Sequence, residues 1–159
     1  MILYHGSLEI VEHPQIMEAN RPLDFGTGFY TTTSLQQARR WVKLRMEQLN
    51  VSIGYINIYE YTVKKGLHTR LFRSANEAWV DFVHANRTMQ DYNHDYDIVT
   101  GPVANDNVYL SFNLYESGFI SKRELIRRLK TYKLVDQLLF HTERSLEALT
   151  YTGNKEVKL

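Results

Sequence analysis

Two short motifs near the N-terminus combine residue types that bind planar ligands. Leu3-Tyr4-His5-Gly6-Ser7 ends an apolar run, and Gly26-Thr27-Gly28-Phe29-Tyr30-Thr31-Thr32 passes from a glycine turn into aromatic and β-branched residues. These runs predict strands over 1–5 and 28–33, with a histidine and a tyrosine at their ends. A neutral imidazole hydrogen-bonds hydroxyl groups such as those of a ribose, a glycine backbone admits a planar amide, and a tyrosine ring stacks on a heterocycle.

Each of these residues also has a purely structural interpretation. A strand-end histidine is commonly hydrogen-bonded within its own neighbourhood, and Tyr30 taken alone is typical of a core residue. The pair Gly26-x-Gly28 is no dinucleotide fingerprint, because the third glycine is missing and a strand, not a helix, is expected after it. Its predicted use is steric, as a tight entry to the strand that presents Tyr30.

Other kinds of chemistry are excluded or weakly supported. The chain has no cysteine, which excludes disulfides and a thiol nucleophile. Its six histidines lack the short spacings of zinc sites, so no metal is expected. A serine hydrolase is weakly supported, because no Gly-x-Ser-x-Gly elbow exists and Ser7 lies too close to His5 in sequence.

Polar residues beside Gly101-Pro102 and along one helix are open to two interpretations. Asp97 precedes this dipeptide, and Asn105-Asp106 follows it, so each either orders a loop through its own backbone or brings polar groups to a site.

The basic residues of a predicted helix form a run that is typical of a solvated face, and nucleic acid remains a possible target without being inferred. This run is Lys122, Arg123, Arg127, Arg128, Lys130 and Lys133.

Length and composition indicate one domain. The 159 residues carry 19 Lys and Arg against 18 Asp and Glu, so the net charge of +1 selects neither nucleic acid nor a membrane as partner. We expect a single domain over 1–152 followed by a frayed polar tail over 153–159. Without a signal segment or a run of about 18 apolar residues, a soluble, cytoplasmic protein is expected, with no membrane contact.

Local patterns predict an α+β fold. Ser34-x-x-Gln37 and Ser121-x-x-Glu124 are capping boxes that open helices, and another helix is expected from Asn76 to about Asn86. The first helix should bury a stripe made of Leu35, Ala38, Trp41, Val42 and Leu49. Alternation over 54–63 predicts the longest strand, and further strands are expected over 96–102, 136–141 and 149–152. The segment 107–116 is ambiguous but favours helix, and a short helix is expected over 142–149.

The order of these elements contains few βαβ units, which favours a mostly antiparallel or mixed β-sheet with flanking helices. The first two motifs resemble the opening half of the ADP-ribosyltransferase fold in its His-Tyr-Glu branch, which includes the poly-ADP-ribose polymerases and the diphtheria-type toxins, and this resemblance implies that the sheet is split. More closely, the chain resembles a small bacterial family of unknown function grouped with that fold. Supporting motifs are Gln37-Ala38-x-x-Trp41, Trp79-x-x-Phe82-Val83-x-x-Asn86-Arg87, Tyr96-Asp97-Ile98-Val99-x-Gly101-Pro102-Val103-Ala104-Asn105-Asp106 and Asp136-Gln137-x-x-Phe140-His141-Thr142.

The resemblance implies an NAD site with assigned roles. His5 would hydrogen-bond the ribose hydroxyls of NAD, the Gly6 backbone would pair with the nicotinamide amide, and Tyr30 would stack on the nicotinamide ring. Neighbouring residues of the same motifs are expected to bind NAD as well. These are Ser7, Thr31, Thr32 and Asn105.

The third residue of the His-Tyr-Glu set departs from the branch. Where the branch places a glutamate on a late strand, this chain has Gln137, with Glu143 as a second candidate. A carboxylate on the ribose 2′-hydroxyl stabilises the positive charge that develops during glycosidic cleavage, which a neutral amide does less well. Asp106 is expected to supply a charge if its loop lies near.

The resemblance therefore implies a mono-ADP-ribosyltransferase rather than a polymerase. Relatives of this kind resemble toxins encoded beside small antitoxins, so the expected partners are NAD, an intracellular acceptor that is a protein or nucleic acid, and an antitoxin protein. One alternative is an inactive module that binds NAD or ADP-ribose and acts through protein contacts, because an amide replaces the acid. Another is a protein-interaction domain without a nucleotide site.

Overall fold

The computed structural model describes residues 1–18, 23–103 and 106–159, and it shows an α+β fold with a seven-stranded sheet. The strand order is β4-β5-β6-β2-β1-β3-β7, in which only the β4–β5 pair is parallel. The predicted α+β class with a mixed sheet is therefore confirmed. The strands are β1 (Ile2–Ser7), β2 (Phe29–Thr32), β3 (Ile53–Tyr61), β4 (Thr69–Leu71), β5 (Ile98–Pro102), β6 (Asp136–Phe140) and β7 (Leu149–Lys158).

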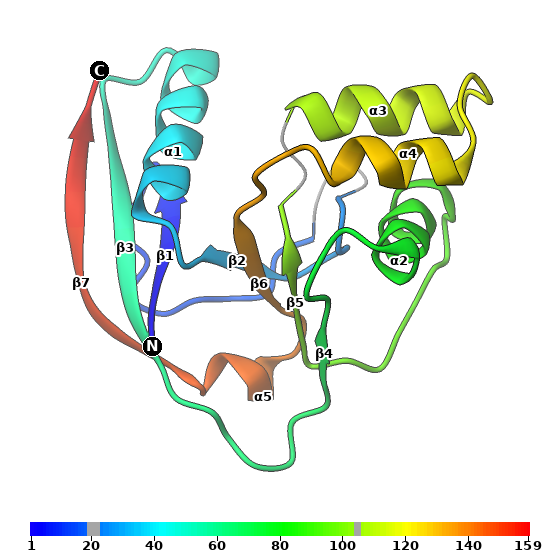
Figure 1. Cartoon of the computed structure of the whole chain (residues 1–159). Helices are drawn as coiled ribbons and strands as arrows, with labels where there is room; N and C mark the ends of the chain where they lie inside the picture. Colours follow the sequence, from blue (N-terminus) through cyan, green and yellow to red (C-terminus); the bar gives the residue numbers. More distant parts are fainter. Residues whose placement is uncertain (19–22, 104–105) are drawn as a thin grey trace.

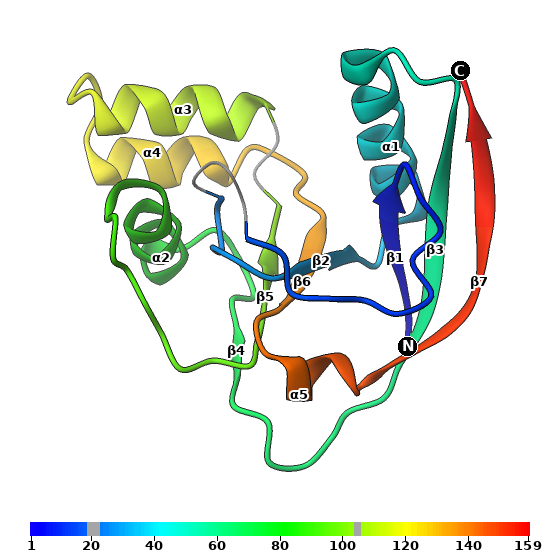
Figure 2. The same cartoon turned by 180° about the vertical axis from the view of Figure 1, so that it is seen from behind.

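Two groups of helices lie beside the two halves of the sheet (Figures 1 and 2). One half, formed by β1, β3 and β7, packs against α1, whereas α2, α3 and α4 gather beside the half that contains β5 and β6. The short α5 lies at the opposite end from α1 and α3. The helices are α1 (Leu35–Leu49), α2 (Glu77–Thr88), α3 (Asp106–Glu116), α4 (Lys122–Leu129) and α5 (Glu143–Leu146).

Local caps begin the helices where the sequence predicts them. The Ser34 side chain accepts a hydrogen bond from the Gln37 backbone, and Ser121 does the same for Glu124, so one orphan donor in the first turn of each helix has a partner. Asn76 caps α2 through Trp79. The segment that favoured helix over 107–116 is α3, as predicted.

Helix α1 approaches the sheet closely because two glycines leave room for it. A Cβ on Gly6 would lie 2.7 Å from the Ala38 carbonyl oxygen, and one on Gly54 would lie 2.5 Å from Cγ1 of Val42. The helix buries Ala38, Val42 and Met46 against these strands. The expected stripe was partly wrong, because Trp41 is 42% exposed and Leu49 is 53% exposed.

The C-terminal segment corrects the expectation of a frayed tail over 153–159. Strand β7 continues through Lys158 and pairs along the whole of β3, from Leu149 opposite Tyr61 to Lys158 opposite Ile53. It also exceeds β3 in length, so 54–63 was wrongly expected to hold the longest strand. The segment is polar because it forms an edge of the sheet, where charged side chains discourage pairing with other chains and Val157 is buried.

The sheet is split between β1 and β2. Within the described residues these strands share one ladder pair, Tyr4 with Thr32, after which they diverge. Strand β1 pairs along its other side with β3 over six positions, and β2 pairs with β6 over four. Backbone groups of β1 and β2 therefore border a gap in the hydrogen-bond ladder at the centre of the sheet.

Candidate functional site

The three residues expected to form the site lie on neighbouring strands at the centre of the sheet. His5 is on β1, Tyr30 on β2 and Gln137 on β6, and these strands are adjacent in the order β6-β2-β1. Residues that are 132 positions apart in the chain are thereby brought to one region of the fold. The ladder pairs Thr32 with Gln137, which places the late amide directly opposite the end of β2.

The imidazole of His5 bridges the split. Its Nδ1 lies 2.7 Å from the backbone oxygen of Tyr30, and its ring stacks on Phe29 with centroids 4.3 Å apart. Because a carbonyl oxygen only accepts hydrogen bonds, Nδ1 carries the proton and Nε2 of the neutral ring presents a lone pair. Burial lowers the pKa of His5, although the Tyr30 carbonyl opposes this shift, so the ring is neutral at pH 7.

Tyr30 is held by the glycine turn that precedes it. Its hydroxyl donates a hydrogen bond of 2.8 Å to the backbone oxygen of Gly26, and its ring packs against the core beside α2 and α3. Burial raises the pKa of this phenol, with a smaller contribution from the Asp24 carboxylate. The hydroxyl therefore stays protonated, and the ring orientation is fixed by the turn over 26–28.

Gln137 is buried with unused hydrogen-bonding capacity. Its side chain belongs to a residue that is 7% exposed, and its Nε2 has no hydrogen-bond partner among the described residues. An unpartnered buried amide is destabilising by about 1–3 kcal/mol, so such groups are rare in native proteins and commonly have a functional reason. A ligand that accepts a hydrogen bond from this amide would supply one.

Strand alternation separates the side chains of the three residues between two faces. Tyr4, Thr32 and Gln137 are ladder partners and share one face, and Tyr30 lies two positions from Thr32 on that face. The His5 ring points to the opposite face, beside Phe29. A ligand that touches all three residues therefore has to lie across the split between β1 and β2.

The remaining predicted residues have structural partners or lie outside the described residues. Gly6 faces α1, so its missing side chain first serves helix packing, and the hydroxyls of Thr31 and Thr32 donate to backbone oxygens of Leu138 and Asp136. The Ser7 hydroxyl accepts a hydrogen bond from the Glu9 backbone. Asp106 begins α3, but its side chain, like all of Asn105, is outside the described residues.

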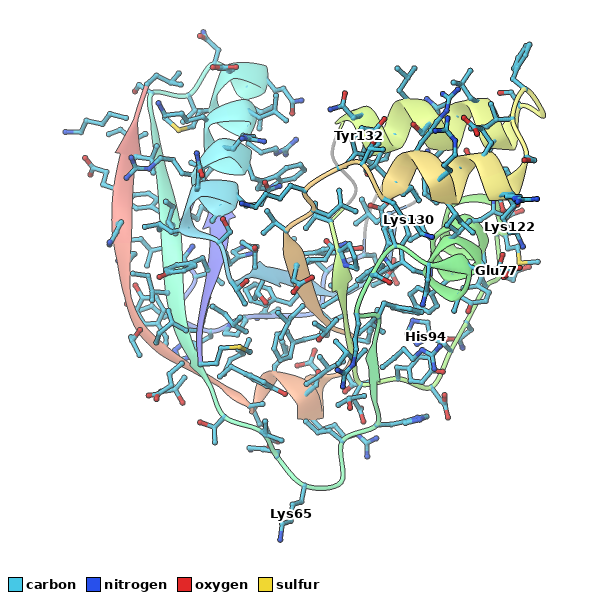
Figure 3. All side chains as sticks on the ribbon, in the orientation of Figure 1. Lys65, Glu77, His94, Lys122, Lys130 and Tyr132 are labelled. Atoms are coloured by element: carbon cyan, nitrogen blue, oxygen red, sulfur yellow. The ribbon has the colours of Figure 1, made fainter. Side chains whose placement is uncertain are left out.

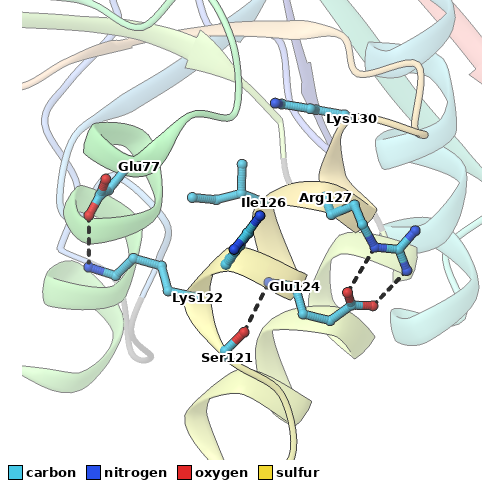
Figure 4. A pocket seen from close by; sticks show the side chains of 8 residues that line it. Glu77, Ser121, Lys122, Glu124, Ile126, Arg127 and Lys130 are labelled. Carbon is cyan, nitrogen blue, oxygen red and sulfur yellow. Dashed lines mark hydrogen bonds and ion pairs between the residues drawn. The ribbon is translucent and has the colours of Figure 1, made fainter.

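Two hollows are described, and neither is lined by His5, Tyr30 or Gln137. The first, here named the α4 hollow, has a volume of about 710 Å³ and follows the predicted basic face. Figure 4 shows its ion pairs: Lys122 reaches Glu77 at 3.6 Å, and Arg127 binds Glu124 at 2.8 Å. Lys122 and Arg127 therefore already have carboxylate partners, which favours the interpretation of this face as a solvated helix surface.

A second cluster of polar residues was not predicted as a unit. Asp97 accepts hydrogen bonds from the Arg144 guanidinium at 2.7 and 2.6 Å, from the Thr142 hydroxyl at 2.6 Å and from the His68 backbone at 2.8 Å. The guanidinium of Arg144 is the main reason that the pKa of Asp97 is lowered, to about 2. Asp97 and Thr142 of this cluster come from two separate sequence motifs, one with Tyr96-Asp97 and one with His141-Thr142. The presence of polar residues in both motifs was the sequence signal that could have indicated the cluster.

The comparisons with known proteins identify a family. The model of DUF3990, a protein of unknown function, matches residues 1–151. The chain belongs to this family. No curated protein and no solved structure matched it. The expected membership of a family of unknown function is confirmed, whereas the relation to ADP-ribosyltransferases stays a prediction.

Two further findings limit the chemistry of the described residues. They contain no group of three or more His, Asp or Glu side chains placed to hold a metal ion. Every helix in the described part of the chain is too short or too polar to span a bilayer.

Proposed function

We propose that this DUF3990 protein is an NAD-dependent mono-ADP-ribosyltransferase. The observation that carries the proposal is the central split, where the imidazole of His5 presents a lone pair and the buried amide of Gln137 lacks a partner on the neighbouring strands. NAD offers ribose hydroxyl groups that donate to Nε2 of His5 on one face of the sheet and accept from the Gln137 amide on the other. The split also leaves strand-edge backbone, with which a planar carboxamide can pair.

In the proposed reaction, the side chains position NAD and the acceptor supplies the nucleophile. Transfer breaks the bond between the ribose anomeric carbon and the nicotinamide nitrogen, which keeps the electron pair, and an acceptor nucleophile then bonds to that carbon and loses its proton. His5 on one face of the sheet and Gln137 on the other hydrogen-bond ribose hydroxyls of NAD, and Tyr30 packs against the leaving ring. The transition state is oxocarbenium-like, so a charged partner near the 2′-hydroxyl accelerates the reaction.

Gln137 sets the expected rate. Its amide orients the ribose but carries no charge, so we expect slow turnover, and Asp106 at the start of α3 is the candidate for the missing carboxylate. Gln137→Glu should increase nicotinamide release at least tenfold if the residue lies beside the ribose. Unchanged release in this variant would contradict the assigned place of Gln137.

The direct experiment incubates the protein with NAD labelled on the adenylate and with bacterial lysate. We expect nicotinamide release together with label on a lysate component. His5→Asn keeps an amide donor for the Tyr30 carbonyl but removes the acceptor at Nε2, and it should lower the rate at least tenfold. The matched control is His13→Asn, since His13 is exposed. Absence of both release and transfer in the wild type would contradict the proposal.

A specific observation also favours a second candidate, an inactive module that binds NAD or ADP-ribose. The neutral amide at Gln137 holds a ribose without stabilising positive charge. Calorimetry that shows NAD binding without turnover, and without gain of turnover in Gln137→Glu, would favour this candidate over the enzyme.

We further propose that the enzyme acts as the toxin of a toxin–antitoxin pair on an intracellular target. Support comes from the sequence resemblance alone. Expression of the wild type in bacteria should arrest growth, whereas His5→Asn should not, and a small protein encoded beside it should relieve the arrest. Growth that is equal for both forms would contradict the toxin role.

A further inference from the structure

The second hollow lies at the far end of β6 from Gln137. It has a volume of about 600 Å³, here named the His141 hollow, and is bounded by the turn before β2, the loop between α2 and β5, and the start of α5. Figure 3 shows His94, one of its residues, below α2 and on the opposite side of the molecule from α1. The lining includes Phe25, Asn86, Tyr92, His94, Asp95 and His141.

His141 lines this hollow and carries an unsatisfied acceptor. Its Nδ1 lies 2.8 Å from the backbone oxygen of Thr27, so Nδ1 carries the proton and Nε2 bears a lone pair. That Nε2 is buried and has no hydrogen-bond partner among the described residues. Burial, reinforced by neighbouring His94, lowers the pKa of His141 to about 4, so the lone pair is free at neutral pH.

The walls of the hollow are aromatic. The ring of His94 lies 4.4 Å from His141, 5.3 Å from Tyr96 and 6.3 Å from Tyr92, measured between centroids. Faces of such rings attract flat cations as well as flat neutral groups. The hollow therefore has surfaces for a planar ligand and an acceptor for one of its N–H groups.

The charges around the hollow favour a cation over an anion. Asp97 is neutralised by its two bonds to Arg144, and the Asp95 carboxylate is exposed and remains as one net negative charge when histidines are neutral. A phosphate would meet this carboxylate and the lone pair of His141, both of which repel it, and the guanidinium of Arg144 on the same lining already pairs with Asp97. A guanidinium group combines a positive charge, a flat face and several N–H donors.

The same imidazole touches the turn that orients Tyr30. Thr27 receives the His141 hydrogen bond, and the preceding residue, Gly26, receives the Tyr30 hydroxyl at 2.8 Å. An occupant that donates to Nε2 favours the tautomer with its proton on Nδ1, which is the one bonded to Thr27. Occupancy of the hollow therefore stabilises the conformation of the turn.

We infer that the His141 hollow is a second ligand site, selective for a guanidinium group and coupled through the turn over 26–28 to Tyr30. The site itself stands on the geometry of the hollow, whereas the coupling to NAD rests on the proposed function. The group is supplied either by a free arginine derivative or by an arginine side chain of a polypeptide.

The first experiment measures binding without NAD by calorimetry, with arginine amide and its uncharged analogue citrulline amide. We expect arginine amide to bind at least tenfold more tightly. His141→Asn keeps a donor for Thr27 but lacks an acceptor at the ε position, so it should lose most of that preference. His141→Gln places an oxygen at that position and should keep it, and His13→Asn is the exposed control. Equal binding of the two amides, or an unchanged preference in His141→Asn, would overturn the site.

The source and the coupling are tested in further arms. An arginine-containing peptide that binds at least tenfold more tightly than arginine amide would indicate a polypeptide occupant, and equal affinity would indicate a free molecule. Saturating arginine amide should lower the NAD dissociation constant about threefold in the wild type but not in His141→Gln, which lacks the bond to Thr27. An NAD dissociation constant that is the same with and without arginine amide would overturn the coupling. A wild type that binds no NAD would contradict the proposed function, and the first experiment would still decide the site.

Discussion

The buried polar groups at the two ends of β6 differ in whether they have hydrogen-bond partners. Beyond its C-terminal end, Asp97 has four hydrogen bonds from three partners, and each of its carboxylate oxygens is used. At its N-terminal end, Gln137 keeps an amide nitrogen that has no hydrogen-bond partner in the described part of the chain. A fully satisfied buried group ties elements together, whereas an unsatisfied one is destabilising unless a ligand supplies its partner.

The largest expected loss of stability follows from changing Asp97, beyond the C-terminal end of β6. Asp97→Ala removes the acceptor for Arg144, Thr142 and the His68 backbone and should lower the free energy of unfolding by about 2–4 kcal/mol. Urea denaturation measures this change, with Asp91→Ala in an exposed loop as control. A loss as small as that of the control would mean that the cluster does not join these elements.

The pH dependence of stability separates the aspartate from the histidines. Because the folded pKa of His141 is lowered from 6.5 to about 4, the unfolded chain binds more protons between these values, and stability falls as pH drops through this window. His5 and His94, whose pKa values are also lowered, act in the same direction. Asp97 contributes stability above its ordinary pKa of 3.8, and this is lost as pH falls towards 2.

His141→Asn should therefore reduce the slope of the free energy of unfolding against pH, between pH 4 and 6.5, by up to about 1.4 kcal/mol per pH unit. The loss of stability below pH 3.8, which comes from Asp97, should be unchanged. Urea midpoints measured from pH 7 to pH 3 test this, with His13→Asn as control. A profile between pH 6.5 and 4 that matches the wild type would show that His141 titrates normally in the folded protein.

A smaller effect is expected at the turn over 26–28. Tyr30→Phe removes one hydrogen bond to Gly26 and keeps the ring, so stability should fall by about 1 kcal/mol. Tyr55→Phe is the matched control, because no hydrogen bond of its hydroxyl is described on β3. Equal stability of both variants would indicate that the phenol does not hold the turn.

The smallest expected effect is at the unsatisfied end. Gln137→Met replaces the unpartnered amide with an apolar group of similar length, and we expect stability to stay within about 1 kcal/mol of the wild type or to rise. Chemical denaturation provides the measurement, and exposed Gln15→Met is the control. A loss above about 2 kcal/mol would show that the amide has a structural partner and would weaken the proposed ribose contact.

Much of the secondary structure could be predicted from the sequence because its signals are local. The caps at Ser34 and Ser121 need groups only three residues apart, and the alternation over 54–63 reports one strand by itself. The three-residue strand β4 was missed, because its stability comes from pairing with β5 rather than from its own pattern. The start of the edge strand β7 was predicted over 149–152, but its continuation through Lys158 was mistaken for a tail, because its polarity is also typical of disorder.

For the candidate site, the sequence alone determined which residue types are present: a histidine and a tyrosine in short strands, a glutamine on a late strand, and membership of DUF3990. Only the tertiary structure decided that these strands are adjacent, that His5 points to the opposite face from Tyr30 and Gln137, and that His141 borders a separate hollow. The physical reason is that register and face depend on ladder pairs between residues more than a hundred positions apart, such as Thr32 and Gln137, which no local pattern encodes.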